Sequence, residues 1–426
     1  MNNNNTTYID SPLGKIPNDW EVKKLEKITE KIGDGLHGTP EYVSSSEYYF
    51  INGNNLKDGL VQINADSKCV SKEEYLKHKK ELKYKTILLS INGTIGSIAF
   101  YKNENIVLGK SAAYINCKDE NVDYLYYYLQ SQSTVNFFEG ELTGSTIRNL
   151  SLKSIREIPV SLPPLPEQKR IAQVLSTWDE AITKTNQLIA QKELRKKWLM
   201  QQLLSGKKRL PVFTKSSAGK KRFNAAWQGV RMSDVFKRVT RKNNETNSNV
   251  VTISAQRGFV RQVDFFNKLV ASDILDNYFL VEKGEFCYNK SYSNGYPWGA
   301  TKRLNDFDKA VVTTLYICFA LKDAKAHSGD FFEHFFKANL LDRGLTQIAH
   351  EGGRAHGLLN VTPGDFFNLT ITIPSKQEQD AIAQVLQTSD KEIQLLKTKF
   401  KKLKEQKKGL MQVLLTGKKR LKIKAL

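Results

Sequence analysis

Apolar residues recur in alternating steps of four and three along two stretches of the chain. The apolar positions of this pattern are Ile171, Leu175, Trp178, Ile182, Ile189, Leu199 and Leu203 in the first stretch, and Ile382, Leu386, Ile393, Leu396, Phe400, Leu403, Leu410 and Leu414 in the second. Polar residues interrupt the pattern at Thr185, Lys192, Lys196, Ser389 and Lys407. Because such spacing places side chains on one face of a helix, as in the seam of a coiled coil, the pattern predicts two long helices.

The ends of both helices are marked by local signals. Pro166 and Glu167 suit a helix start, whereas Gly206 and Gly417 suit helix ends. Each helix is then about 36 residues long, roughly 54 Å at about 1.5 Å per residue. Each helix packing only on its own globular domain is the alternative. Pairing of the two helices is favoured because a domain of about 140 residues has a radius of gyration of only about 14 Å.

The chain contains an internal duplication. The segment "EQKRIAQVL" at Glu167 to Leu175 returns as "EQDAIAQVL" at Glu378 to Leu386, 211 positions later, and "LLSGKKRL" returns at the same offset as "LLTGKKRL". Further upstream, Trp20 opens a segment that pairs loosely with one opened by Trp227, 207 positions later. Each repeat therefore consists of a variable globular stretch followed by a more constant helix.

Chain topology then predicts the architecture. The first helix leads from one globular domain to the other, and the second leaves the second domain with an almost identical sequence. We therefore expect an α+β fold in which two mixed α/β domains are separated by an antiparallel coiled coil, with an internal pseudo-twofold repeat. The expected boundaries are 1–162 and 211–373 for the domains, and 163–210 and 374–426 for the helical segments.

The positive charge is concentrated in the helical segments. The formal net charge is +21, of which residues 1–160 contribute −1, 161–222 contribute +10, 223–372 contribute +3 and 373–426 contribute +9. A strongly basic chain indicates an anionic partner. The helices either face a phosphate backbone or a negatively charged protein, or they expose a solvated face. Nucleic-acid binding by the nearly neutral domains requires local patches.

Other composition signals narrow the class of protein. No apolar run reaches the roughly 18 residues of a membrane span, and the N-terminus does not resemble a signal peptide. We therefore expect no membrane association and a cytoplasmic location. The four cysteines are scattered without metal-ligand spacing and are interpreted as buried or incidental thiols.

Polar loops in the two globular stretches carry the candidate binding chemistry. The first stretch contains "IGDGLHGTP" from Ile32, "TILLSINGTIGSIAF" from Thr86, which predicts two strands around an Asn-Gly hairpin turn, and "LTGSTIRNL" from Leu142. The second contains "NKSYSNGYPWGATKR" from Asn289 and "EGGRAHGLLN" from Glu351. Such loops offer donors and acceptors to base edges and phosphates, although turn formation alone also explains them.

Together, these loops, the "PLPEQ" connector and the duplicated "LLSGKKRL" helix ends closely resemble the specificity (S) subunits of Type I restriction-modification systems, the HsdS family. The resemblance covers nearly the whole chain. It implies two target recognition domains that each read one half of a split, asymmetric sequence in double-stranded DNA, with a coiled coil as spacer. It also implies assembly with two modification (methyltransferase) subunits and with restriction subunits that act as ATP-dependent translocases and endonucleases.

The chain is expected to have no catalytic activity, no metal site and no cofactor of its own, with S-adenosylmethionine and ATP bound only by partner subunits. The only Pro-Pro pair is Pro163-Pro164 in the connector, so no Asn-Pro-Pro-Tyr type methyltransferase motif is present. Glu282, Glu285 and Lys290 do not make a convincing nuclease pattern. His37, His350 and His356 lack a surrounding carboxylate or cysteine set.

The candidate DNA-binding residues form one cluster per domain: Asp34, His37, Thr39, Asn92, Thr94, Ser145, Thr146 and Arg148 in the first, and Asn289, Lys290, Ser291, Tyr292, Asn294, Tyr296, Arg354 and His356 in the second. Two other classes of protein stay open. A coiled-coil scaffold with two protein-binding domains predicts no DNA sequence preference. A single-strand or RNA binder predicts stacking aromatics, for which Tyr288, Tyr292, Tyr296 and Trp298 are candidates.

Overall fold

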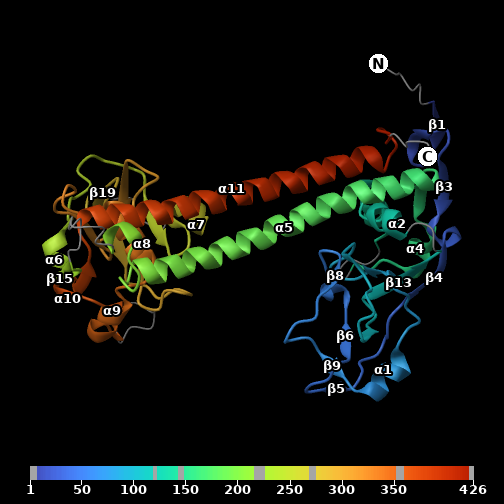
Figure 1. Ribbon diagram of the computed structural model, residues 1–426, viewed down its shortest axis with the longest axis horizontal. Coiled ribbons are helices and arrows are strands. Elements are labelled where there is room, and N and C mark those ends of the chain that lie inside the picture. The colour runs from blue at the N-terminus through green and yellow to red at the C-terminus, as the bar shows by residue number, and fades with distance from the viewer. Residues whose placement is uncertain are drawn as a thin grey trace. The chain divides into compact units, whose positions relative to one another are not determined.

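The computed structural model describes residues 7–118, 122–142, 148–214, 226–267, 275–351 and 359–421. The chain forms two compact units, unit 1 with residues 1–186 and 398–426, and unit 2 with residues 187–397. The two long helices, α5 (Leu165–Leu203) and α11 (Lys376–Leu414), each contribute one half to each unit (Figure 1). Each unit thus combines a globular domain with two helix halves.

The halves of α5 and α11 run antiparallel within each unit. In unit 1 the Nζ of Lys407 lies 2.6 Å from the Oδ1 of Asp179. In unit 2 the Nζ of Lys192 lies 2.5 Å from Glu392, and that of Lys397 lies 2.6 Å from Glu193. Since early residues of one helix meet late residues of the other, the antiparallel pairing that the sequence predicted is present in both units.

The predicted seam residues are all at least partly covered. Buried seam residues are Ile171, Leu175, Ile189, Leu203, Ile382, Leu386, Ile393 and Leu414, and half-buried ones are Trp178, Ile182, Leu199, Leu396, Phe400, Leu403 and Leu410. The polar interruptions are compensated locally. Lys196 pairs with Asp390 and Lys407 with Asp179, while the hydroxyl of Thr185 donates to the carbonyl of Ala181 at 2.7 Å.

Both helices end at a glycine in the left-handed region, because Gly206 and Gly417 each have φ of +70°. A tryptophan of the same unit packs on each glycine. An added Cβ at Gly206 would lie 3.2 Å from the ring of Trp227, whereas one at Gly417 would lie 2.4 Å from the Cδ of Pro17 and 3.4 Å from Trp20. The equivalent helix ends therefore differ in how tightly they are packed.

Gly417→Ala is expected to destabilise unit 1 by about 1 to 2 kcal/mol more than Gly206→Ala destabilises unit 2. Both variants strain the backbone equally, but only the first also forces an overlap with a rigid proline ring. Hydrogen-deuterium exchange of peptides from each unit measures the two losses in the full chain. Equal losses in the two variants would contradict the packing difference.

The globular domain of unit 1 contains two four-stranded sheets. The main sheet has the order β11-β10-β13-β4 and the second sheet β12-β6-β9-β5. Their strands are β4 (Thr29–Asp34), β10 (Ile87–Ser90), β11 (Ile98–Phe100) and β13 (Ala112–Cys117), and β5 (Tyr42–Val43), β6 (Tyr49–Ile51), β9 (Cys69–Val70) and β12 (Ile106–Leu108). The shorter strands are β1 (Tyr8–Ser11), β2 (Gly14–Pro17), β3 (Glu21–Lys24), β7 (Leu56–Lys57), β8 (Leu60–Val61) and β14 (Pro159–Leu162), and the helices are α1 (Lys72–His78), α2 (Val122–Tyr128), α3 (Gln132–Glu141) and α4 (Leu152–Glu157).

Unit 2 repeats this topology with a different sequence. Its main sheet has the order β16-β23-β20-β21, so β20 (Phe286–Asn289) corresponds to β10. In the same way β16 (Phe236–Arg238) corresponds to β4, β21 (Ala300–Arg303) to β11 and β23 (Ile317–Leu321) to β13. Around it lie β15 (Gln228–Arg231), β17 (Val251–Ser254), β18 (Gly258–Arg261), β19 (Phe279–Glu282), β22 (Lys309–Val312), β24 (His350–Glu351), β25 (Leu359–Asn360) and β26 (Thr370–Ile373), with α6 (Met232–Val235), α7 (Gln262–Phe266), α8 (Gly329–Lys337), α9 (Asp342–Ile348) and α10 (Pro363–Asn368). The predicted internal repeat is thus also a repeat of fold.

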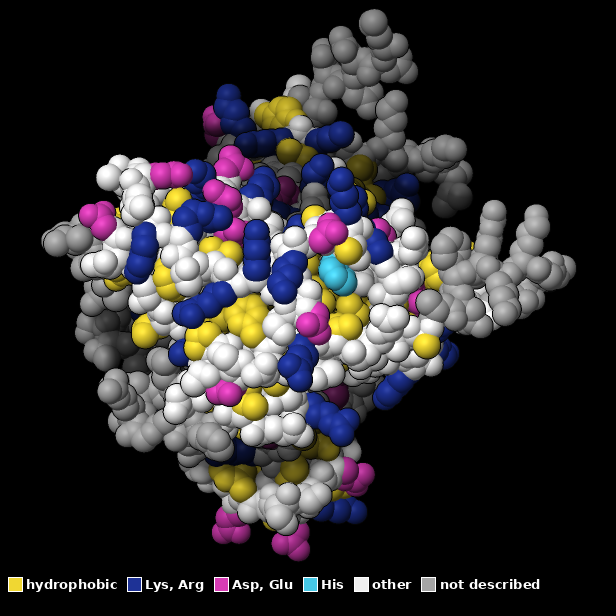
Figure 2. Space-filling model, turned by 90° about the vertical axis from the view of Figure 1, so that its left-hand side faces the viewer, with side chains coloured by type: hydrophobic (Ala, Val, Ile, Leu, Met, Phe, Trp, Pro, Cys, Tyr) yellow, Lys and Arg dark blue, Asp and Glu magenta, His cyan; other side chains and the backbone are white. Residues whose placement is uncertain are grey.

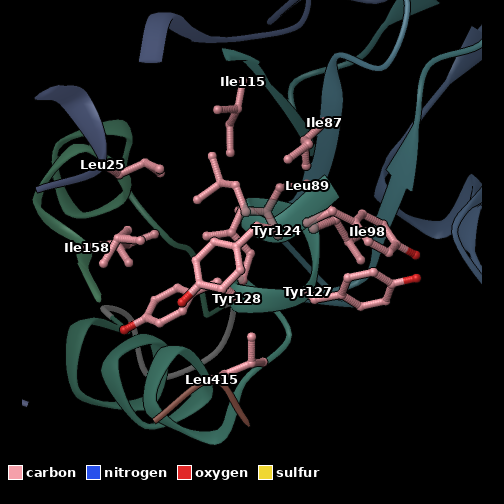
Figure 3. Packing of buried hydrophobic residues seen from close by; sticks show 14 of the residues in the cluster. Leu25, Ile87, Leu89, Ile98, Ile115, Tyr124, Tyr127, Tyr128, Ile158 and Leu415 are labelled. Carbon is pink, nitrogen blue, oxygen red and sulfur yellow. The ribbon is translucent and has the colours of Figure 1, made fainter. Parts of the chain in front are cut away.

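Each hydrophobic core joins a globular domain to the helix halves of its own unit. In unit 1 the aromatic residues of α2, including Tyr124 and Tyr128, pack between the main sheet and Leu415 just beyond α11 (Figure 3). In unit 2 the phenylalanines of α8 pack on β20 and β23 and on the helix residues Leu203 and Leu386. Burial of these side chains fixes each domain on its own helix halves.

One local expectation differs from the structure, and one contact was not predicted. The strands β10 and β11 pair antiparallel, with Leu89 opposite Ile98, but their connection spans residues 91–97 and is not a two-residue Asn-Gly turn. Cys287 and Cys318, which are far apart in the sequence, face each other on β20 and β23 as buried free thiols with Sγ atoms 3.2 Å apart. The scattered spacing of the cysteines had concealed this cross-strand pair.

Candidate DNA-reading surfaces and the family of the chain

In unit 1 three of the predicted residues, Asp34, Asn92 and Thr94, lie where β4 and β10 end, at the same end of the main sheet. Asp34 ends β4 opposite Ala113 of β13, and the neighbouring Ala112 lies opposite Ser90 at the end of β10. The loop after β10 then carries Asn92 and Thr94, and Asn92 forms a bridge with Asn149. Strand pairing therefore places two of the three predicted loops, those after β4 and β10, at the same end of the sheet.

Hydrogen bonds organise this surface. The Nε2 of His37 lies 2.7 Å from the Oδ2 of Asp34, and the hydroxyls of Ser90 and Thr94 lie 3.0 Å apart. His37 and Thr39 are exposed, as is Arg148. The sequence had not predicted the carboxylate partner of His37. Since the pair is exposed and no third group is bonded to it among the described residues, it is not arranged as a catalytic triad.

In unit 2 the equivalent residues follow β20. Asn289 lies opposite Ala300, and its Oδ1 accepts a 3.0 Å hydrogen bond from the amide of Ser291. The carbonyl of Lys290 accepts a bond of 3.1 Å from the amide of Leu359. The loop after β20 thus meets the segment before α10, as the loop after β10 meets the segment before α4 in unit 1. Each candidate surface has the same construction but different side chains.

The remaining predicted residues of unit 2 differ in exposure. Tyr292 is 66% exposed, and Asn294 is also exposed, with its carbonyl accepting a bond from the Nε2 of Gln256. Tyr296 is half-buried, and the Nζ of Lys302 lies 4.6 Å from its ring centroid. Burial lowers the pKa of Lys302 to about 8. The predicted residues Ser145, Thr146, Arg354 and His356 lie outside the described residues.

The aromatic residues do not form a continuous stacking platform. Tyr288 is 1% exposed and stacks on Phe366 at 5.0 Å within the core, so it is unavailable to a nucleobase. Trp298 is partly buried and packs against the same core. Of the four candidates named from the sequence, only Tyr292 is largely exposed, which disfavours the single-strand or RNA-binding alternative.

One ion pair is duplicated, and in each unit it joins the start of one long helix to the segment after the end of the other. Glu167 and Glu378, whose side chains are 1% and 0% exposed, accept from Arg420 in unit 1 and Arg209 in unit 2, with Nη2 to Oε2 distances of 2.6 Å. In unit 1 the hydroxyl of Tyr127 also donates to Asp179 at 2.9 Å. These contacts join residues far apart in the sequence within one unit.

His334 of α8 stands 207 positions after Tyr127, the same offset that relates the two tryptophans. It is 5% exposed, and its Nδ1 is buried without a hydrogen-bond partner. Burial lowers the pKa of His334 to about 4, while the nearby Asp390 opposes this shift and Lys196 adds to it. Unit 2 therefore holds a neutral histidine where unit 1 has a tyrosine bonded to an aspartate.

On the face shown in Figure 2, lysine and arginine side chains are spread between hydrophobic and uncharged groups and do not gather in one block. Glu282 and Glu285, which the sequence raised as a weak nuclease pattern, instead bind Arg241 at 3.2 and 3.0 Å. Their carboxylates serve an ion-pair network, which is an ordinary structural role.

Among the described residues, no group of three or more histidine, cysteine, aspartate or glutamate side chains is placed to hold a metal ion. None of the described helices is both long and apolar enough to cross a lipid bilayer.

Comparison with known proteins agrees with the repeated architecture. The chain is similar to the Type I restriction enzyme MjaVIII specificity subunit of Methanocaldococcus jannaschii, with 23% identity over 96% of this chain and 95% of that protein. It shares its fold with the crystal structure of a Type I restriction-modification S subunit from M. genitalium, with a TM-score of 0.53, 15% identity and 97% of each chain covered. The HsdS subunit from Thermoanaerobacter tengcongensis gives a TM-score of 0.51 at 14% identity, with 96% of this chain and 99% of that chain covered.

The family model described as the Type I restriction modification DNA specificity domain matches twice, at residues 17–193 and 224–405. Each match begins near the tryptophan of one repeat and ends within a long helix. With two matching copies that span most of its length, and with the same fold repeated in both units, this chain belongs to the family of Type I restriction-modification DNA specificity proteins.

Proposed function

We propose that this chain reads a bipartite, asymmetric sequence in double-stranded DNA, with one half-site recognised by each globular domain. The observation that carries the proposal is that two domains of equal topology present different side chains on equivalent surfaces. Asn92 and Thr94 follow β10 in unit 1, whereas Lys290, Ser291 and Tyr292 follow β20 in unit 2. Because different side chains read different base edges, the two half-sites differ in sequence.

The proposal extends to two modification subunits as partners. When the two helical repeats are aligned, residues 167–182 match 378–393, and residues 196–210 match 407–421, with many identical positions. The stretches between them, 183–195 and 394–406, share no identical position. Exposed residues are among the repeated ones, for example Gln173 with Gln384 and Gln201 with Gln412. Two copies of one partner require two copies of one surface, and these helix segments supply them.

The chain acts in this proposal without catalysis. It directs methyltransferase and ATP-dependent restriction subunits to the DNA, and these subunits bind S-adenosylmethionine and ATP. The cytoplasmic location expected from the sequence belongs to the same proposal. The two long helices connect the domains and set the length of the unread spacer between the half-sites, so lengthening both helices is expected to lengthen that spacer.

Exchange of residues 1–160 for the corresponding domain of a relative with a different target is expected to change one half-site only. The reason is that each domain has its own sheets, core and loops. Methylated positions in the DNA of a host that carries the chain and its modification subunits, mapped by long-read sequencing, give the target before and after exchange. A palindromic target, or a change in both half-sites, would contradict the proposal. Absence of any sequence preference would favour the scaffold alternative.

A further inference from the structure

Unit 2 has a pocket where three segments of its sheets end. The pocket has a volume of about 350 Å³ and lies at the ends of β17 and β20 and beside the turn after β22. Its polar lining includes Thr252, Gln256, Asn289, Ser291 and Tyr316. Two of the residues predicted for DNA binding, Asn289 and Ser291, therefore line a concave site that the sequence did not predict.

The floor of this pocket is held by hydrogen bonds. The hydroxyls of Thr252 and Tyr316 lie 3.1 Å apart, and the amide of Ile253 donates to the same tyrosine oxygen at 3.3 Å. The Nδ2 of Asn289 donates to the carbonyl of Ile253 at 3.5 Å. These bonds cross from β17 to β20 and to the segment after β22, so the pocket is formed before any ligand binds.

The same place in unit 1 is closed. There the ends of β6 and β10 and the turn after β12 meet directly, since the amide of Gly53 donates to the Oγ of Ser111 and this hydroxyl donates to Asn52, both at 2.9 Å. A Cβ added at Gly53 would lie 2.1 Å from the Oγ of Ser90. The pocket is thus a property of unit 2 and not a consequence of the shared topology.

Exposed apolar side chains surround the opening in unit 2. Phe265 and Phe266 of α7 are 40% and 43% exposed, and Leu315 is 56% exposed. The two phenylalanine rings lie 4.8 Å apart at 85°. Single exposed apolar residues are ordinary, but three around a polar pocket indicate a surface that is covered when a ligand binds.

The charge around the pocket favours an anionic ligand. The guanidinium of Arg257 lies 5.3 Å from the ring centroid of Phe265, and Lys290 belongs to the lining. No aspartate or glutamate is among the described residues that line the pocket. Burial lowers the pKa of Lys290. A partly desolvated lysine gains interaction energy when an anion replaces the lost water, so a polyanion such as DNA suits this site.

Aromatic rings around a floor of amide and hydroxyl groups suit a planar ring that has hydrogen-bonding edges. A nucleobase is such a ring, and within a duplex it reaches a pocket only by leaving the base stack. We propose that one nucleobase of the half-site read by unit 2 leaves the stack and enters this pocket. The proposal rests on the DNA-reading function proposed above and deepens it.

The test uses the full chain in complex with its modification subunits and a duplex that carries the mapped target. At each base pair of the unit 2 half-site, two mismatched duplexes are made, one by changing the base on the first strand and one by changing the base on the second. Binding of each duplex is measured by titration. A mismatch at the extruded base removes the energy of unpairing, so binding at one position is expected to tighten by about tenfold. The gain should disappear in Phe266→Ala and in Leu315→Ala, whose side chains are exposed and do not belong to the hydrophobic core.

Leu76→Ala is the matched control, because Leu76 is 51% exposed on α1, the helix of unit 1 that corresponds to α7. This variant should keep the gain. If the modification subunits extrude a different base of the DNA, the mismatch at that base tightens binding equally in all variants. Only a gain in binding that depends on Phe266 and Leu315 therefore supports the pocket. Normal discrimination of the target without such a dependent position would overturn the pocket alone. If the complex with the unchanged chain binds all DNA sequences equally, the DNA-reading function is overturned as well.

Discussion

Arg420→Ala is expected to destabilise unit 1 by about 3 to 5 kcal/mol, because it leaves a buried carboxylate without its cation. The side chain of Glu167 is 1% exposed and accepts from the Nε and Nη2 of Arg420 at 2.7 and 2.6 Å. The indole of Trp20 donates to it as well, at 3.3 Å, but a neutral donor does not balance the charge. Arg420 also binds Asp19 at 2.8 Å, so the loss reaches the start of the domain.

Two further variants separate the lost cation from lost packing. Glu167→Gln combined with Arg420→Ala removes the buried charge and should recover more than half of the lost stability. Arg209→Ala makes the equivalent change in unit 2, where Glu378 is fully buried, and its effect should appear in the peptides of unit 2. Hydrogen-deuterium exchange of the full chain measures both. A loss below about 1 kcal/mol for Arg420→Ala would place this pair among surface ion pairs.

Lowering the pH from 7 to 4 is expected to remove about 3 kcal/mol of stability from unit 2 through His334 alone. The pKa of this histidine is about 4 in the folded chain because of burial, against an ordinary value of 6.5 in the unfolded chain. Above pH 6.5 both states are neutral and this group has no effect. Between the two values the unfolded chain binds a proton that the folded chain does not, so stability falls until pH 4 is reached.

The charges that face His334 are Asp390 of α11, Lys196 of α5, and Lys337 and Asp330 of α8. The aspartates also titrate in acid, so the comparison must be with a chain that lacks only the histidine. His334→Gln, and His334→Tyr, which copies the residue in unit 1, should lose about 3 kcal/mol less than the unchanged chain between pH 7 and 4. Equal acid sensitivity of all three chains, measured by denaturant unfolding, would show that His334 does not titrate as described.

The contrast between Tyr127 and His334 shows what repeated topology leaves open. Both residues face an aspartate and a lysine of the helices, but only the tyrosine has a hydroxyl placed to donate to its aspartate. Knowing the offset of 207 identifies the equivalent position. It does not predict that burial holds the histidine neutral, because burial depends on the phenylalanines of α8 and on both helices.

The sequence by itself determined the two long helices, their seam, their glycine ends and the repeat. These features depend on periodicity and local signals that residues a few positions apart carry, and a duplication is visible in any sequence that retains it. It also identified the loops after Ser90 and Asn289 as polar, glycine-bearing segments, although it predicted a tighter turn in the first of these than the structure has.

Only the tertiary structure decided which segments meet. Asn92 lies beside Asn149, and Cys287 lies beside Cys318. Phe266 and Ser291 line the same pocket. Each of these contacts joins residues that are far apart in the chain. Whether the meeting point of three strand ends is filled, as at Gly53, or open, as at Asn289, depends on side-chain volumes contributed by separate strands. No local pattern encodes such a sum, because each strand is compatible with either outcome until its neighbours are in place.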